Sequence, residues 1–286
     1  MLVDKPAGPT SHDVVIRVRR ALGIRSAGHT GTLDPFATGL LLVLLGRATR
    51  LARFVSGQPK RYLATARLGF ATTTDDSTGD PAGPLHGPAV RPGDTEVRAA
   101  LEAFRGDSLQ RPPAYSARHV DGERSYRLAR RGVEVALAES PVTVHAIELV
   151  DMHGDSVVFR TTVSAGTYVR ALARDLGERL GTGAHLTALR REAIGSFEVG
   201  RAVPLAGLGR DTPLLSPLDV VAHLPVRVLD EAALRDVSHG RSIERGLVEG
   251  SPEEGAPVSL VFDGRLVAVG EQREGRLHPG VVLENA

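Results

Sequence analysis

A loop punctuated by glycine and proline leads straight into an apolar run, and this stretch limits how the chain can fold. Three glycines within residues 28–41 allow a positive φ and a close approach of the backbone. Asp34 precedes Pro35, whose ring fixes its own φ and keeps the residue before it out of the α region. The apolar run 40–45 follows and has the length of a buried strand. The pattern predicts a carboxylate held on a constrained loop beside a buried strand.

A structural role for Asp34 is equally compatible with these residues. Aspartate is a frequent helix N-cap and proline is frequent at the first helical position, so Asp34 could cap a short helical turn that Pro35 begins. A single Asp-Pro pair does not decide between this role and a chemical one.

The octet at residues 28–35, Gly-His-Thr-Gly-Thr-Leu-Asp-Pro, closely resembles the catalytic motif of the TruB family of tRNA pseudouridine synthases. Further stretches resemble the family in the same order along the chain, at residues 60–62, 111–132, 164–170 and 184–191. Together they span most of residues 1–200. The resemblance implies a pseudouridine synthase fold, which is α/β with a mixed, mainly antiparallel central sheet, followed by a small C-terminal β domain of the PUA type.

The reaction of such an enzyme breaks the bond from uracil N1 to the ribose and remakes it from C5. An ionised carboxylate near the sugar can attack C1′ or remove the C2′ proton, and the sequence leaves both pathways open. The resemblance implies that Asp34 is this carboxylate and that Arg170 lies against it. Taken alone, Arg170 lies off the apolar stripe of its helix, which is also typical of a solvated surface residue.

Three more site residues follow from the resemblance. Tyr62 enters the active site, and Leu189 corresponds to an apolar residue that packs on the target base. The chemistry of the reaction suggests that Tyr62 stacks on the uracil and that its oxygen helps to remove the C5 proton. His29 fills the space that the flipped base leaves. By the residues alone, Tyr62 is an ordinary strand tyrosine and His29 is a core or turn histidine.

Residues 111–131 are basic and contain interleaved tyrosines. They carry six arginines against two acidic residues, a net charge of +4, which is typical of a surface that tracks phosphates and stacks bases. A solvated helix face fits the pattern equally well. In the TruB family this region is a flexible insertion that helps to hold tRNA. Within this stretch the candidate RNA-binding residues are Arg124, Arg127 and Arg130. The other candidate RNA-binding residues are Lys5, His29 and Leu189.

The composition excludes several classes of site. The chain of 286 residues has 42% hydrophobic and 24% charged residues, which is ordinary for a globular protein, and no cysteine, so disulfides, thiolate metal sites and a cysteine nucleophile are excluded. No phosphate-binding loop, dinucleotide fingerprint or metal-spaced histidine pair is present, and we expect neither cofactor nor metal. With no signal-peptide pattern and no long apolar run, we expect a cytoplasmic protein without membrane association.

The charge is unevenly distributed over two expected domains, a catalytic domain at residues 1–223 and a PUA-like domain at 224–286. The first carries a net charge of +5 and the second a net charge of −4. The negative charge of the second domain is unusual for a surface that binds RNA. Within the second domain, Asp263-Gly264 is a strong hairpin signal between the apolar segments 258–262 and 265–270. Of the 35 basic residues 33 are arginine, which suits RNA, although codon usage in a GC-rich genome explains most of this bias.

Several elements of the first domain can also be predicted. Thr10 and Asp13 form a capping-box pattern that opens a helix ending at Gly23. Another short helix is expected at residues 94–105 with Asp94 as its cap. We further expect a helix that begins near Val169, strands at residues 60–69, 142–147 and 156–161, and a loop from residue 71 to 93.

The sequence therefore predicts a tRNA pseudouridine synthase that acts on the T-loop uridine at position 55, with the T stem-loop as its partner and no obligate protein partner. Three rivals stay open: a synthase guided by a small RNA, an RNA-folding chaperone without turnover, and an Asp-dependent hydrolase. The hydrolase would need two carboxylates, and the matched motifs offer only Asp34.

Overall fold

The computed structural model describes residues 1–82, 92–116, 119–120, 123–125, 131, 137–250 and 252–283. Two of the predicted RNA contacts, Arg127 and Arg130, lie outside the described residues. For Arg124 only the backbone is described, in the short strand β9 (Glu123–Arg124), which pairs with β8 (His119–Val120).

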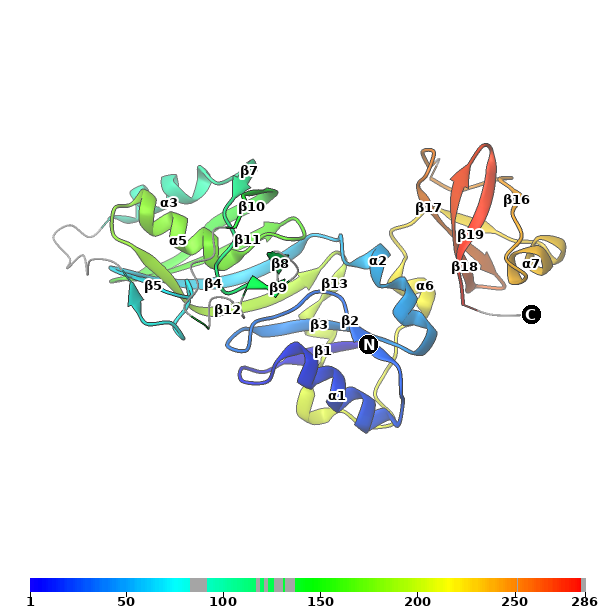
Figure 1. The fold of residues 1–286 in the computed structure, drawn as a ribbon, viewed down its shortest axis with the longest axis horizontal. Helices are drawn as coiled ribbons and strands as arrows, with labels where there is room; N and C mark the ends of the chain where they lie inside the picture. Colours follow the sequence, from blue (N-terminus) through cyan, green and yellow to red (C-terminus); the bar gives the residue numbers. More distant parts are fainter. Residues whose placement is uncertain are drawn as a thin grey trace.

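A ten-stranded mixed sheet forms the centre of the molecule (Figure 1). Its order is β14-β1-β3-β12-β4-β11-β10-β7, with β2 added to β3 and β13 to β12. Within the described chain the pairs β1–β14 and β3–β12 are parallel and the other pairs of this sheet are antiparallel, which confirms the mainly antiparallel sheet. The strands are β1 (Leu2–Lys5), β2 (Ala27–His29), β3 (Thr38–Leu45), β4 (Lys60–Leu68), β7 (Gly106–Gln110), β10 (Ser140–His153), β11 (Ser156–Val163), β12 (Ala184–Ile194), β13 (Phe197–Glu198) and β14 (Val203–Pro204).

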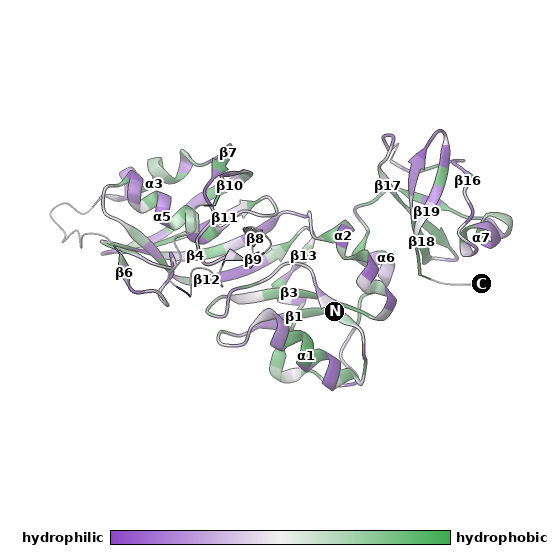
Figure 2. Ribbon diagram, viewed as in Figure 1, coloured by the Kyte–Doolittle hydropathy of each residue, from purple (hydrophilic) through white to green (hydrophobic). Residues whose placement is uncertain are grey.

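Helix α1 (Ser11–Leu22) covers the part of the sheet near β1 and β3. Its capping box between Thr10 and Asp13 and its left-handed C-cap at Gly23, with φ of 66°, are as predicted. The helix buries its valines against β1 and β3, and the alternation of apolar and polar residues along it is visible in Figure 2. Burial of this stripe, rather than helix propensity, fixes the helix against the sheet.

Helices α3 (Asp94–Glu102) and α5 (Val169–Arg179) pack on the other half of the sheet in one apolar cluster. The predicted cap Asp94 is wrong by one position, because Gly93 is the N-cap and Asp94 is the first helical residue. The expected loop at 71–93 contains a small hairpin of β5 (Ala71–Thr72) and β6 (Pro81–Ala82). Two-residue strands are too short to give a periodic signal in a sequence.

The C-terminal part forms a separate five-stranded sheet with the order β15-β17-β18-β19-β16. Asp263 and Gly264 turn the β17–β18 hairpin with φ of 48° and 69°, as the sequence predicts. Asp230 caps α7 through its side chain. The elements are β15 (Val226–Val228), α7 (Glu231–Ser238), β16 (Ile243–Glu244), β17 (Pro257–Phe262), β18 (Arg265–Arg273) and β19 (Arg276–Val282).

The two sheets are joined through an apolar cluster and not through a linker alone. Leu40 and Leu42 of β3 belong to the same buried cluster as Val269 and Val281 of the C-terminal sheet. Arg47 adds a hydrogen bond of 2.8 Å to the carbonyl of Leu283. Short helices lie at this junction, namely η1 (Gly46–Leu51), α2 (Ala52–Val55) and α6 (Pro217–Val220), and η2 (Val199–Arg201) and η3 (Leu205–Gly207) follow β13 and β14 (Figure 1). Among the described residues, no helix is both long enough and apolar enough to cross a membrane.

Candidate active site

Asp34 lies on the loop between β2 and β3, with 36% of its side chain exposed. The loop makes a tight turn in which the amide of Ala37 donates to the carbonyl of Asp34 at 3.1 Å. No helix begins at Pro35, so the alternative role of Asp34 as a helix cap is wrong. Leu33, the residue before Asp34, is buried and exchanges two hydrogen bonds with the hydroxyl of Ser11 on α1.

A buried lysine holds the loop on one side of Asp34. Lys5 at the end of β1 is fully buried, and its ammonium donates to the carbonyls of Pro35 at 3.2 Å and Ala37 at 2.7 Å. Burial lowers the pKa of Lys5 to about 8, although the nearby carboxylate of Asp34 opposes this shift. Lys5 was predicted to contact RNA, but in this structure its charge faces the loop and not the solvent.

A buried arginine holds the loop on the other side. Arg191 of β12 is 1% exposed and donates to the carbonyls of Gly31 at 3.1 Å, Thr32 at 3.4 Å and Leu40 at 2.7 Å. At Gly39, with φ of 103°, a Cβ atom would lie 2.3 Å from the carbonyl oxygen of Arg191. A glycine is therefore required where β3 meets β12. The role of Arg191 was not predicted, since its only signal was a position within the fourth matched stretch.

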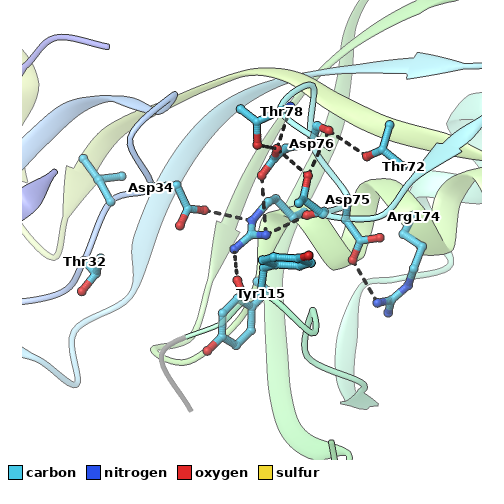
Figure 3. A network of polar contacts seen from close by, with 12 residues as sticks. Thr32, Asp34, Thr72, Asp75, Asp76, Thr78, Tyr115 and Arg174 are labelled. Atoms are coloured by element: carbon cyan, nitrogen blue, oxygen red, sulfur yellow. Dashed lines mark hydrogen bonds and ion pairs between the residues drawn. The ribbon is translucent and has the colours of Figure 1, made fainter. Parts of the chain in front are cut away.

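Arg170, at the first turn of α5, points its guanidinium at Asp34. Its Nε lies 2.9 Å from Oδ2 of Asp34, and a dashed line from the labelled Asp34 marks this contact in Figure 3. The Arg170 side chain is only 5% exposed. The Nε–H is not aligned for a hydrogen bond with that oxygen, so the contact is an ion pair. The structure thus brings together the two residues that the resemblance paired, and it buries the arginine that lay off the apolar stripe.

A second carboxylate borders the same guanidinium. Oδ2 of Asp76 lies 3.5 Å from Arg170 Nη1, which also donates to the carbonyl of Thr74 at 2.7 Å. Arg170 Nη2 donates to the carbonyl of Tyr115 at 2.8 Å. Oδ1 of Asp76 accepts from the backbone and the hydroxyl of Thr78, which locks the turn that carries it (Figure 3). These contacts fix the arginine from the side away from Asp34.

The turn that carries Asp76 is tied to α5 a second time. Asp75, in a left-handed conformation with φ of 59°, pairs with Arg174 at 3.2 Å, one helical turn beyond Arg170. Burial raises the pKa of Asp75 to about 6, although Arg174 and Arg170 oppose the shift. Neither aspartate was predicted at the site, because the region reads as a loop and its only signal was the run of threonines and aspartates at residues 72–78.

Apolar side chains line the site next to Asp34. Tyr62 of β4 is 8% exposed and Leu189 of β12 is 7% exposed. Both belong to one apolar cluster with Leu33 and Ala37 of the loop, and the partly buried Phe36 packs against it. The predicted base-contacting residues are therefore grouped with the loop that carries the carboxylate.

His29 is at the end of β2, just before the same loop. Its Nδ1 is buried and has no hydrogen-bond partner within the described part of the chain. Burial and the nearby charge of Arg191 lower the pKa of His29, so its imidazole is neutral at pH 7. A neutral, flat and half-buried ring is suited to packing against a base.

Comparison with known families gives a decisive match. A model of the TruB family pseudouridylate synthase N-terminal domain matches residues 19–169, and a model of the tRNA pseudouridylate synthase B C-terminal domain matches residues 170–212. The chain belongs to the TruB family. As a TruB enzyme it isomerises uridine to pseudouridine. The matched segments contain Asp34, Tyr62 and Arg170, whereas the five-stranded C-terminal sheet lies beyond residue 212.

Curated relatives in the TruB family are similar over nearly their whole length. The tRNA pseudouridine synthase B of Arthrobacter sp. (strain FB24) is 41% identical over 99% of this chain and 95% of its own. That of Thermobifida fusca (strain YX) is 44% identical over 99% and 97%. A solved archaeal box H/ACA sRNP Nop10–Cbf5 complex is similar with 26% identity and a TM-score of 0.75, over 99% of this chain and 85% of that chain. These matches confirm the pseudouridine synthase fold.

Proposed function

We propose that this TruB enzyme converts the T-loop uridine at position 55 of tRNAs to pseudouridine, with Asp34 as the catalytic carboxylate. The contact between Asp34 and the buried guanidinium of Arg170, next to the apolar cluster that contains Tyr62 and Leu189, carries the proposal. The names and full-length similarity of the curated relatives support tRNA as the substrate.

The surroundings of Asp34 suit an ionised carboxylate that acts on the ribose. Arg170 stabilises its charge and fixes one oxygen, while Lys5 and Arg191 add positive charge behind the loop. The exposed third of the side chain leaves room for a sugar to approach. Attack at C1′ and removal of the C2′ proton both need this charge and orientation, and both remain compatible with the site.

Tyr62 and Leu189 would hold the free uracil while it turns to present C5. Their burial in one apolar cluster keeps water from the base, and stacking on Tyr62 keeps it from diffusing away. The phenol oxygen of Tyr62 is the candidate for taking up the C5 proton. Moving the base out of its stack costs a few kcal/mol, and the ring of His29 would partly offset this by filling the vacated space.

We place the RNA contacts mainly on the basic stretch 111–131, with the T stem-loop as the bound element and no obligate protein partner. Arg124, Arg127 and Arg130 remain proposed contacts. The division into a catalytic domain at 1–223 and a PUA-like domain at 224–286, and a cytoplasmic location, are likewise proposals. A synthase guided by a small RNA is the rival in chemistry, because the archaeal relative belongs to a box H/ACA sRNP.

The proposal is tested with an unmodified tRNA transcript that carries tritium at uridine C5. We expect release of label from position 55 without free uracil and without added RNA or protein. A transcript with cytidine at position 55 is the matched control. Binding without release would favour a chaperone, free uracil would favour a hydrolase, and dependence on a second RNA would favour the guided synthase.

The same assay tests the expectation that no metal takes part. The enzyme is treated exhaustively with EDTA and given a prefolded T stem-loop, so that RNA folding does not depend on magnesium. Full activity is expected, because the proposed steps use only Asp34, Tyr62 and Arg170. Activity that returns only on addition of one specific divalent metal would contradict this mechanism.

A further inference from the structure

One face of α1 carries basic side chains and lies outside the site described above. His12, Ile16, Arg19 and Arg20 recur at intervals of three and four residues, so they lie on the same side of the helix. His12, Arg19 and Arg20 are exposed, while the valines of the opposite face are buried against the sheet. The face therefore presents imidazole and guanidinium groups to the solvent along the length of the helix.

The face ends at an open hollow of about 340 Å³. Arg19, Arg20 and Arg25 line it together with Ile16 and Ile24. None of the three arginines makes an ion pair within the described residues.

Two arginines of the large sheet, by contrast, are paired with carboxylates. Arg67 pairs with Asp155 at 2.9 Å, and Arg160 pairs with Glu148 at 3.0 Å. Three guanidinium groups gathered around one hollow without a carboxylate repel one another, so the site favours an anionic partner.

The helix dipole accounts for only part of this arrangement. Cationic side chains in the last turn of a helix are stabilised by the helix dipole, which covers Arg19 and Arg20. Arg25 lies beyond the C-cap Gly23, where the chain has left the helix, yet it lines the same hollow. An arginine recruited from outside the helix indicates a site and not a helix end alone.

The basic face begins at the active site. Ser11 at the start of α1 bonds to Leu33, the neighbour of Asp34, and His12 is close enough to His29 to interact with it electrostatically. At a rise of 1.5 Å per residue, Arg20 lies about 12 Å along the helix from His12. The hollow is therefore within reach of an RNA strand whose target base lies at Asp34.

We propose that the α1 face binds the phosphate backbone of the substrate RNA next to the target uridine, with Arg19, Arg20 and Arg25 as the phosphate site. This rests on the proposed function and adds a second RNA-binding region to the stretch 111–131. Guanidinium groups bind phosphate oxygens in a bidentate manner, and the apolar floor of Ile16 and Ile24 supports the sugar.

The test measures affinity for an isolated T stem-loop over a salt series, in an Asp34→Asn background so that the RNA is not converted. In the variant Arg19→Ala/Arg20→Ala/Arg25→Ala, the negative slope of log affinity against log salt should become flatter. Its magnitude should decrease by about 0.7–0.9 for each phosphate that is no longer neutralised. The matched control is Arg98→Ala/Arg210→Ala/Arg235→Ala, which removes the same charge from exposed arginines elsewhere. Its slope should stay close to that of the parent.

A lysine variant at the same three positions separates charge from packing. Because lysine also binds phosphate, it should restore most of the slope that is missing in the alanine variant. An unchanged slope in the alanine variant, an equal decrease in the control, or a decrease that lysine does not restore would each overturn the phosphate site. Tritium release by the wild-type enzyme is measured separately, so failure of the proposed function is distinguishable from failure of this site.

Discussion

Arg170 joins two carboxylates from distant parts of the chain, with its Nε 2.9 Å from Asp34 and its Nη1 3.5 Å from Asp76. Asp34 is partly exposed, while the side chains of Arg170 and Asp76 are about 5% exposed. Asp76 fixes the guanidinium from the buried side, and the guanidinium fixes the partly exposed carboxylate of Asp34. This asymmetry fits the proposed roles, with Asp76 as a positioning residue and Asp34 as the reacting carboxylate.

Replacement of Asp34 by asparagine should abolish turnover and leave RNA affinity within a few fold. The amide keeps the shape of the side chain but has no charge to act on the ribose. We expect kcat to fall by at least about 10³-fold, which corresponds to about 4 kcal/mol of transition-state stabilisation. Single-turnover tritium release and equilibrium binding measure the two effects, and substantial residual turnover would contradict the role of Asp34.

Replacement of Arg170 by lysine should lower kcat by about 10²-fold or more with little effect on affinity. Lysine keeps the charge but cannot contact Asp34, Asp76 and two carbonyl groups in one plane. Arg174→Lys is the matched control on the same helix, because Arg174 pairs with Asp75 and not with Asp34. Equal decreases of kcat in the two variants would show that α5 as a whole, and not the Asp34 contact, is sensitive.

Replacement of Gly39 by alanine should destabilise the protein and displace the loop of Asp34. The φ of 103° alone costs a side chain about 1–3 kcal/mol. The new Cβ would also lie 2.3 Å from the carbonyl of Arg191, a backbone atom that cannot easily move. The thermal unfolding temperature and kcat should both decrease. Gly200→Ala is the control, since a Cβ there meets nothing within 4 Å.

The activity should show no titration of His29 between pH 7 and 8. Burial and Arg191 lower its pKa, so the folded protein favours the neutral imidazole and the unfolded chain takes up a proton first as the pH falls. Stability should therefore decrease as the pH falls through the ordinary histidine range. Unfolding free energies of wild type and His29→Phe across pH 5–8 measure this, and an identical pH dependence in both would contradict it.

The basic stretch 111–131 should contribute more to the salt dependence of tRNA binding than residues 224–286, because their net charges are +4 and −4. Alanine at Arg124, Arg127 and Arg130 should flatten the slope of log affinity against log salt by about 0.7–0.9 per phosphate. Deletion of the C-terminal sheet is a poor comparison, because it would expose the apolar cluster shared with β3. The comparison variant instead carries alanine at Arg235, Arg241 and Arg273. A larger flattening of the slope in this variant would assign the main phosphate contacts to residues 224–286 and not to the stretch 111–131.

Much of the fold could be predicted because its signals are local. The capping box at Thr10 and Asp13, the left-handed stop at Gly23 and the turn at Asp263-Gly264 each depend on a few neighbouring residues. The apolar stripe of α5 could be predicted in the same way from its spacing. The two-residue strands β5 and β6 were not, because strands of this length show no periodicity in the sequence.

The sequence by itself determined the family, since the octet around Asp34 and its order with Tyr62 and Arg170 are carried by residue identity. Only the tertiary structure decided what the charged residues around it do. Lys5 and Arg191 are indistinguishable from surface cations in the sequence, yet burial turns them toward the loop carbonyls. A buried cation must find oxygen partners, and which carbonyls it finds depends on how β1, β3 and β12 lie side by side in the sheet.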